Sequence, residues 1–333
     1  MLLNKQIEIP GVKRPQLFIS AAFVCLVVLL ISNPANAEEP SKNIRVVTTV
    51  PPITNIVENV GGAHVSVVGI VPNGVDSHTF EPVPADAKTL AEADIIIVNG
   101  LDLEMPTIKL TEKVKKSDAP IVRLGNKTLR KEEWQYDFSF PREHGHPNPH
   151  LWPNIALTIK YVEIIRDYLV EFDPLHKDAY VANASIYSAK LKQLDEAIFA
   201  CVRSIPENNR KLVTYHDSFA YFAPRYGMQV IAAIQPANFT EPGPREVIRI
   251  IEQIKNEKIP AIFGSEVFPS KIMAQIARES GARFIEELSD DELPEKPNDS
   301  FIGMMVNNMA IMSDALGGDP DCAANVDTRN LIY

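Results

Sequence analysis

Four side chains in the sequence have the chemistry of metal ligands and lie where a fold could hold them rigidly. His78, His150 and His216 carry imidazoles, and Asp291 carries a carboxylate. Three imidazoles and one carboxylate satisfy a four-coordinate Zn²⁺. The same set with a bidentate carboxylate suits Mn²⁺. Because four protein ligands leave no open position, the set favours holding an ion over catalysis on it.

The surroundings of His216 indicate how it would be positioned. Residues 211–215 are typical of a short buried strand, and the spacing of Phe219 and Phe222 predicts a helix over residues 218–223 that ends before Pro224. His216 therefore lies at the carboxyl end of a strand. In open α/β sheets, ligands bind at that edge.

The other three candidates lie in loops, and each has a simpler interpretation. His78 lies between a strand and a helix, and could be a turn residue that caps the helix. His150 lies between two prolines, with Trp152 as an apolar wall beside it, although the segment could equally be a linker. Asp291 follows a strand, but an Asp-Asp-Glu run is also typical of a solvated loop. Asp290 is a rival for the fourth position.

The first 37 residues indicate a secretory signal peptide. A basic start precedes an apolar run over residues 17–31, and Ala35-Asn36-Ala37 has the small-x-small pattern of a cleavage site. The run is shorter than the roughly 20 residues of a comfortable membrane span. Cys25 lies in the middle of the run and not at a cleavage boundary, which argues against a lipid anchor on it. We therefore expect a periplasmic protein, cleaved after Ala37, with no stable membrane insertion.

Without this segment, the number of basic residues falls from 33 to 30 and the number of acidic residues falls from 43 to 42. The mature chain therefore has a formal charge of −12. Such a charge argues against binding to nucleic acid or to an anionic membrane surface, and it suits a cationic ligand.

Strand-like and helix-like segments alternate along the chain, which is typical of α/β proteins with parallel sheets. The predicted strands are 44–50, 65–71, 95–98, 121–124, 211–215, 229–233, 261–263 and 283–288. The predicted helices are 53–60, 84–91, 155–170, 174–203, 218–223, 244–256, 270–279 and 301–316. We expect two Rossmann-like α/β lobes, over residues 38–173 and 204–333.

The predicted helix over residues 174–203 separates the two lobes. Tyr180, Ala184, Tyr187, Leu191 and Leu194 recur in it at helical spacing. Some 28 residues of helix form a rod of roughly 40 Å, which we interpret as a stiff connector.

The mature chain has two cysteines, Cys201 and Cys322. An oxidising compartment would allow one disulfide. The sequence does not decide between a disulfide and two buried thiols.

Several motifs together resemble the zinc/manganese class of periplasmic metal-binding proteins that serve ABC transporters (cluster A-I, or cluster 9). They are His-x-x-Glu-Pro at residues 78–82, Asn-Pro-His-x-Trp at 148–152, His-Asp-x-Phe-x-Tyr-Phe at 216–222 and Asp-x-Leu at 291–293. The resemblance covers nearly the whole mature chain. It implies two α/β lobes joined by a long helix, a metal between the lobes, and His78, His150, His216 and Asp291 as its ligands.

The chain departs from the family pattern at two places beside His150. Asn148 replaces the usual Asp, and Pro153-Asn154 replaces the usual Leu-Asp. In this family the third ligand is His or Glu, so His216 favours Zn²⁺, with Mn²⁺ or Fe²⁺ as the alternative ion. Glu143-His144-Gly145-His146 stands where zinc importers carry a long His-rich loop. It is either a reduced metal-gathering loop or an ordinary surface loop.

The resemblance implies a monomeric solute-binding protein, without enzymatic activity, that delivers its ion to a membrane permease. Two other functions compete with it. A secreted zinc hydrolase would need an open coordination position and a base, for which Glu81 is the nearest candidate, but the chain has no His-Glu-x-x-His motif. A surface adhesin would carry the metal site only incidentally.

Overall fold

The computed structural model describes residue 11 and residues 43–265, 271–286 and 288–331. The predicted signal peptide and its cleavage site after Ala37 lie, apart from residue 11, outside the described residues. From Asn43 onward, the described chain belongs to one compact unit. No helix among the described residues has the length and apolar character needed to cross a bilayer.

The first half of this unit forms a four-stranded sheet in the order β2-β1-β3-β4. All its neighbouring strands are parallel. The strands are β1 (Ile44–Thr48), β2 (Val65–Gly69), β3 (Ile95–Val98) and β4 (Ile121–Arg123). The helices that connect or follow them are α1 (Pro51–Gly61), α2 (Pro84–Glu92), α3 (Met105–Val114) and α4 (Leu124–Thr128).

The second half repeats this topology with the strand order β6-β5-β7-β8, again with parallel neighbours. Its strands are β5 (Lys211–Thr214), β6 (Gln229–Ala233), β7 (Ala261–Phe263) and β8 (Arg283–Ile285). Its helices are α7 (Phe222–Tyr226), α8 (Pro244–Glu257), α9 (Lys271–Ser280) and α10 (Phe301–Leu316). The predicted fold of two α/β lobes is therefore confirmed.

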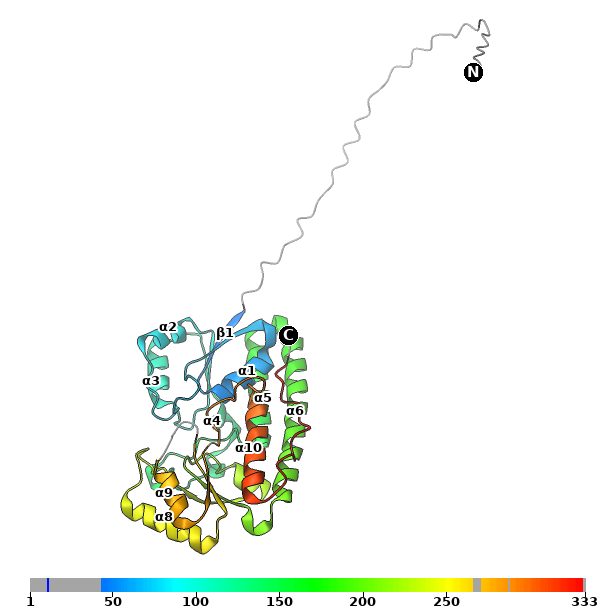
Figure 1. Cartoon of the computed structure of the whole chain (residues 1–333). Helices are drawn as coiled ribbons and strands as arrows, with labels where there is room; N and C mark the ends of the chain where they lie inside the picture. The colour runs from blue at the N-terminus through cyan, green and yellow to red at the C-terminus, as the bar shows by residue number, and fades with distance from the viewer. Residues whose placement is uncertain (1–10, 12–42, 266–270, 287, 332–333) are drawn as a thin grey trace, which may run out of the picture. The chain divides into compact units, whose positions relative to one another are not determined.

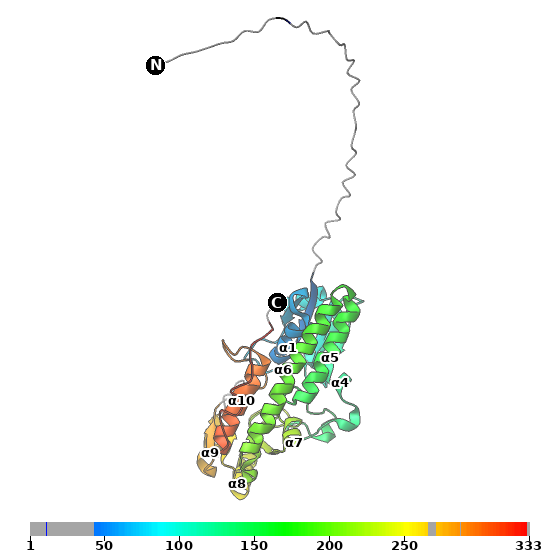
Figure 2. The same ribbon diagram turned by 90° about the vertical axis from the view of Figure 1, so that its right-hand side faces the viewer.

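Two long helices lie between these sheets in the sequence, α5 (Ile155–Phe172) and α6 (Lys177–Ser204). The 28 residues of α6 span about 42 Å. It is more than a connector, because it packs against α1, α5 and α10 along its length. Figure 1 shows α6 beside α5 and α10, and Figure 2 shows it passing both the α1 end and the α8 end of the unit.

One apolar core is continuous across both lobes. It contains β-strand residues of the first lobe such as Ile97, residues of α6 such as Leu191, and residues of the second lobe such as Phe263 and Met309. The opposite face of each sheet has a separate, smaller core. Because opening the lobes would expose the shared core to water, we expect only small changes in the angle between them.

Three helices differ from the sequence predictions, and one of them is the short helix α4, which has no counterpart among the predicted helices. The helix predicted over residues 218–223 is wrong: residues 216–221 are not helical, and α7 runs from Phe222 to Tyr226, with Pro224 inside it. A proline is tolerated in the first turn of a helix because the N–H it lacks would have no partner there. Helix α3 has no counterpart among the predicted elements, since its buried face consists of Thr107, Ile108 and Thr111 and has little apolar periodicity.

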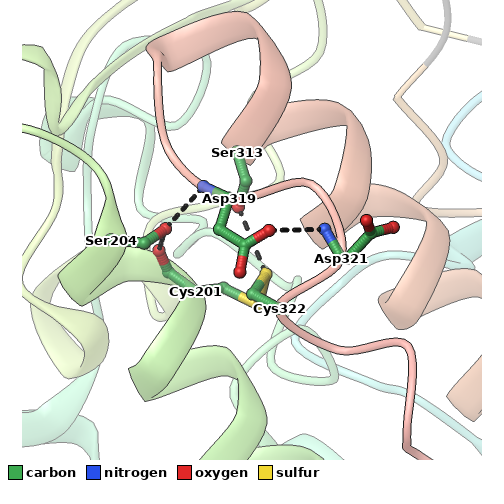
Figure 3. The surroundings of a disulfide bond; sticks show 6 residues. All are labelled: Cys201, Ser204, Ser313, Asp319, Asp321 and Cys322. Carbon is green, nitrogen blue, oxygen red and sulfur yellow. Dashed lines mark hydrogen bonds between the residues drawn. A yellow bond between two sulfur atoms is a disulfide. The ribbon is translucent and has the colours of Figure 1, made fainter.

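The chain after α10 is fastened to α6 by a disulfide. Cys201, in the last turn of α6, is bonded to Cys322 across 121 residues of sequence. Figure 3 shows the hydrogen bond from the Asp319 amide to the Ser204 hydroxyl beside it. Farther along, Asn330 accepts hydrogen bonds from Asn55 and Asn59 of α1, both 2.9 Å long. The C-terminal segment therefore ties the second lobe to the first.

Substituting both cysteines by serine should destabilise the protein by about 2–4 kcal/mol, because the unfolded chain regains the entropy of a long open loop. Urea unfolding of the wild type with and without reductant, beside the double variant, measures this. The reduced wild type should unfold at the same midpoint as the variant. An unfolding midpoint that neither reduction nor substitution shifts would show that the disulfide does not hold this segment.

Candidate metal centre

The three predicted histidine ligands come together although they are far apart in the sequence. His78 lies in the loop between β2 and α2, His150 lies just before α5, and His216 follows β5. The Nε2 atom of His150 lies 3.2 Å from that of His78 and 2.9 Å from that of His216. One nitrogen of each ring lies within 4.8 Å of the other two.

These distances match what a single ion requires. Zinc–nitrogen bonds of about 2.0–2.1 Å in a tetrahedron place neighbouring ligand atoms about 3.3 Å apart. The observed separations of 3.2 and 2.9 Å are slightly shorter than this, so a small outward shift of the rings would admit the ion.

Hydrogen bonds at the far side of two rings decide which nitrogen faces the cluster. The Nδ1 atom of His150 lies 2.8 Å from the Asn148 side-chain oxygen, and that of His216 lies 2.7 Å from the Gln235 side-chain oxygen. An amide oxygen only accepts, so each Nδ1 carries the proton and each Nε2 presents a lone pair. The two Nε2 lone pairs therefore point toward each other, and a cation bound between them would remove their mutual repulsion.

The hydrogen bonds of Asn148 fix its orientation. Its side-chain nitrogen donates to the carbonyl oxygen of Asp217 at 2.7 Å, while its oxygen also accepts from the His150 amide at 3.0 Å. The amide that replaces the usual carboxylate beside His150 therefore still accepts the hydrogen bond from the imidazole. Outer partners of this kind orient metal-binding histidines in many proteins.

The two aspartates after β8 both reach the cluster. His150, Asp290 and Asp291 form a second group whose donor atoms all lie within 4.8 Å of one another. One oxygen of Asp290 lies 3.5 Å from His216 Nε2. One oxygen of Asp291 accepts from the Ser77 hydroxyl at 2.5 Å. The sequence analysis considers Asp290 and Asp291 as alternatives for the fourth ligand, whereas the structure places both at the site.

The centre is dry, and this changes its protonation. His150, Asp290 and Asp291 are buried with at most 3% exposure. Burial and the neighbouring His216 lower the pKa of both His78 and His150 well below the ordinary value for imidazole. Burial also raises the pKa of Asp291. His78 and His150 are therefore neutral at pH 7, which is the form that binds a metal.

A cavity of about 180 Å³ lies outside the cluster. The ring of Phe239 stacks on His78 at a centroid distance of 4.6 Å, and Phe140 packs beside it at 5.6 Å. His144 and His146 also line the cavity, and His146 Nδ1 contacts the Asp102 carboxylate at 2.8 Å. The two exposed histidines therefore stand on a route from solvent to His78.

Trp152 and two other residues support the site. The Trp152 ring packs edge-on against His150 at 5.1 Å, as a wall, and its indole N–H also donates to the Asp290 carbonyl at 2.8 Å. Gln235 and Ser77 are absent from the sequence-based predictions. Gln235 follows β6 at the carboxyl edge of its sheet. Its position just after a predicted strand is the feature of the sequence that could have marked it as a site residue.

The lowered pKa values predict how the stability of the metal-free protein depends on pH. Unfolded imidazoles titrate near 6.5, so below that pH the unfolded chain binds more protons than the folded one, and the free energy of unfolding falls. His78 and His150 together should lower the free energy of unfolding by about 2–3 kcal/mol between pH 7.5 and 5.5. The raised pKa of Asp291 acts with the opposite sign, at lower pH.

Urea unfolding of chelator-treated protein at several pH values measures this dependence. The variant His150→Gln should show a shallower decline, and His144→Gln, which changes an exposed histidine, should match the wild type. Equal slopes in all three proteins would contradict the assignment.

Comparisons with known proteins identify the family of the chain. Residues 46–315 match the family described as zinc-uptake complex component A, periplasmic. The manganese-binding lipoprotein MntA of Halalkalibacterium halodurans is 31% identical, over 86% of this chain and 95% of its own length. The iron-binding protein YfeA of Yersinia pestis is also 31% identical, over 92% of this chain and 98% of its own.

Among solved structures, the periplasmic zinc-binding protein TroA from Treponema pallidum superposes with a TM-score of 0.76. It is 25% identical, and the match covers 83% of this chain and 99% of TroA. The family match spans far more than half of the chain. The protein therefore belongs to the ZnuA family of periplasmic metal-binding components of ABC transporters.

Proposed function

We propose that this protein captures a divalent transition-metal ion outside the cytoplasmic membrane and delivers it to the membrane permease of an ABC importer. The observation that carries the proposal is the convergence of three imidazoles on one point, with Nε2 separations of 3.2 and 2.9 Å. The proposed ligands are His78, His150, His216 and Asp291. A closed set of protein ligands suits transport better than catalysis, which needs an open position.

The identity of the ion is a finer proposal. Relatives in the family are named for manganese, iron and zinc. Three imidazoles by themselves favour Zn²⁺, with Mn²⁺ or Fe²⁺ as alternatives. We further propose a monomer that works in the periplasm after cleavage near Ala37, with lobes over residues 38–173 and 204–333 joined by the helix at 174–203.

Release must come from a change in affinity between two conformations, because no covalent reaction accompanies transport. The shared core and the C-terminal segment restrict movement between the lobes. We therefore propose that one ligand-bearing loop moves while the lobes change their angle only slightly. The loop that carries His78 is a candidate for this movement, because the His78 ring is only half-buried and lines the cavity.

Substituting His216 by alanine should weaken Zn²⁺ binding by more than about 100-fold, because even the outer partners of metal ligands typically contribute about 10- to 100-fold. Competition with a chromophoric chelator measures the affinity, and circular dichroism shows whether the variant is folded. The control is His64→Ala, since His64 stacks on His176 instead of joining the cluster. Unchanged affinity in the folded His216 variant would remove this residue from the site.

The two competing functions make different predictions. Loss of growth in medium poor in zinc and manganese after deletion, restored by added metal, supports transport. Normal growth together with reduced attachment to surfaces would instead support an adhesin. A zinc-dependent hydrolase with Glu81 as base would show hydrolytic activity in the metal-loaded protein. Glu81 is solvent-exposed, which is a poor setting for a general base.

A further inference from the structure

The imidazole of His78 is held differently from the other two rings of the cluster. Those two rings each donate from Nδ1 to a side-chain amide oxygen. Among the described residues, the Nδ1 atom of His78 has no hydrogen-bond partner. Two aromatic rings pack on this imidazole instead: Phe239 stacks on it at a centroid distance of 4.6 Å, and Phe140 lies 5.6 Å away. The position of the His78 ring therefore depends on the rings that cover it.

Phe239 reaches His78 from the loop between β6 and α8. Its neighbours Asn238 and Thr240 are exposed, whereas its own side chain is half-buried and lines the cavity outside the cluster. The Asn238 side-chain oxygen accepts from the Thr240 hydroxyl at 2.8 Å. The Phe239 amide donates to the Pro236 carbonyl oxygen at 2.9 Å. The loop is therefore a tight turn at the surface that directs one aromatic ring inward.

The backbone of Phe239 is strained. Its φ angle is +56°, in the left-handed region that bulky side chains rarely adopt. Among the described residues, four residues other than glycine have a positive φ, and three of them, Leu101, Asp102 and Phe239, line this cavity. Strained backbone of this kind collects at ligand clamps and switch segments, where surrounding contacts hold it in place. We therefore interpret the cavity as the mouth of the site, with the stack on His78 holding Phe239 in its strained conformation.

We propose, on the basis of the function proposed above, that Phe239 is a lid over the metal centre. Its ring closes the route from the cavity to the ion at His78, and it must swing outward before the ion enters or leaves. Because a phenyl ring has no donor atom, Phe239 is not a ligand, and its main effect is on the rate at which the ion exchanges. The same movement uncovers His78, so the lid and the loop that carries His78 open together.

The rates of metal exchange distinguish a lid from a simple support. A lid slows association as well as dissociation, because the ion passes it in both directions. A ring that only kept His78 in place would slow dissociation and leave association unchanged. The association rate is therefore the decisive measurement.

The variant Phe239→Ala tests this proposal, because it removes the ring and keeps the β-carbon. Stopped-flow mixing of Zn²⁺-loaded protein with excess chelator gives the dissociation rate. Mixing metal-free protein with Zn²⁺ gives the association rate, followed by tryptophan fluorescence, since Trp152 packs against His150. Both rates should rise at least about 10-fold in the variant, because a lid that is open about 10% of the time or less slows entry and exit by that factor.

Two further variants serve as controls. Phe239→Tyr keeps an aromatic ring that can stack, so it should restore slow exchange in both directions. Phe138→Ala removes a phenylalanine that is 42% exposed, and it should exchange Zn²⁺ at the wild-type rates. Circular dichroism and the midpoint of urea unfolding show whether each variant is folded.

Four results would overturn the lid. They are wild-type rates in Phe239→Ala, faster dissociation in that variant with unchanged association, fast exchange in Phe239→Tyr, and equal acceleration in Phe138→Ala. The second would show that the ring only supports His78, and the last would show a general loosening of the protein. In each case the transport function would stand. A wild-type protein that binds neither Zn²⁺ nor Mn²⁺ would instead contradict the proposed function itself.

Discussion

Two imidazole lone pairs face each other across 2.9 Å at the centre of this molecule, and the rest of the structure serves to keep them there. Neither Nε2 carries a proton, since both Nδ1 atoms donate to amide oxygens. The carboxyl groups of Asp290 and Asp291 are buried beside them. Such an arrangement is unfavourable in the metal-free protein and becomes favourable when a divalent cation occupies its centre.

The fold meets this constraint by placing ligands where two parallel sheets end. His216 follows the inner strand β5, and the loop of Asp290 and Asp291 comes after the edge strand β8 of the same sheet. His78 comes from the loop that follows β2, so the first lobe supplies one wall of the site. A continuous core along α6 then prevents the lobes from drifting apart. The disulfide and the contacts of Asn330 with α1 fasten the outer side of the unit.

Much of this was predictable from the sequence, because it rests on local patterns. The run Ile95–Val98 is a buried parallel strand, and the spacing from Tyr180 to Leu194 indicates the buried face of α6. The motifs around His78, His150 and His216 indicated the ligand candidates. Helix α3 lacked such a pattern, since threonines occupy its buried face. Residues 216–221, which precede α7, are not helical, and Asp217 among them accepts a hydrogen bond from the Ser139 amide, a contact over 78 positions.

Long-range contacts also explain what sequence reasoning left open at the site. Whether one or both of Asp290 and Asp291 face the imidazoles depends on Trp152 and Ser77, which lie more than a hundred residues away. The pairing of Cys201 with Cys322 likewise depends on where the chain returns after α10. Gln235 orients His216 only because β6 lies beside β5 in the sheet. No local pattern records these neighbours.

The most direct test of the metal centre is an anomalous diffraction measurement on crystals of the metal-loaded protein, collected on both sides of the absorption edge of the bound ion. A single strong peak should lie within about 2.0–2.2 Å of the Nε2 atoms of His78, His150 and His216. A peak elsewhere, or no peak between these three nitrogens in protein that has bound the ion, would contradict the site and the function derived from it.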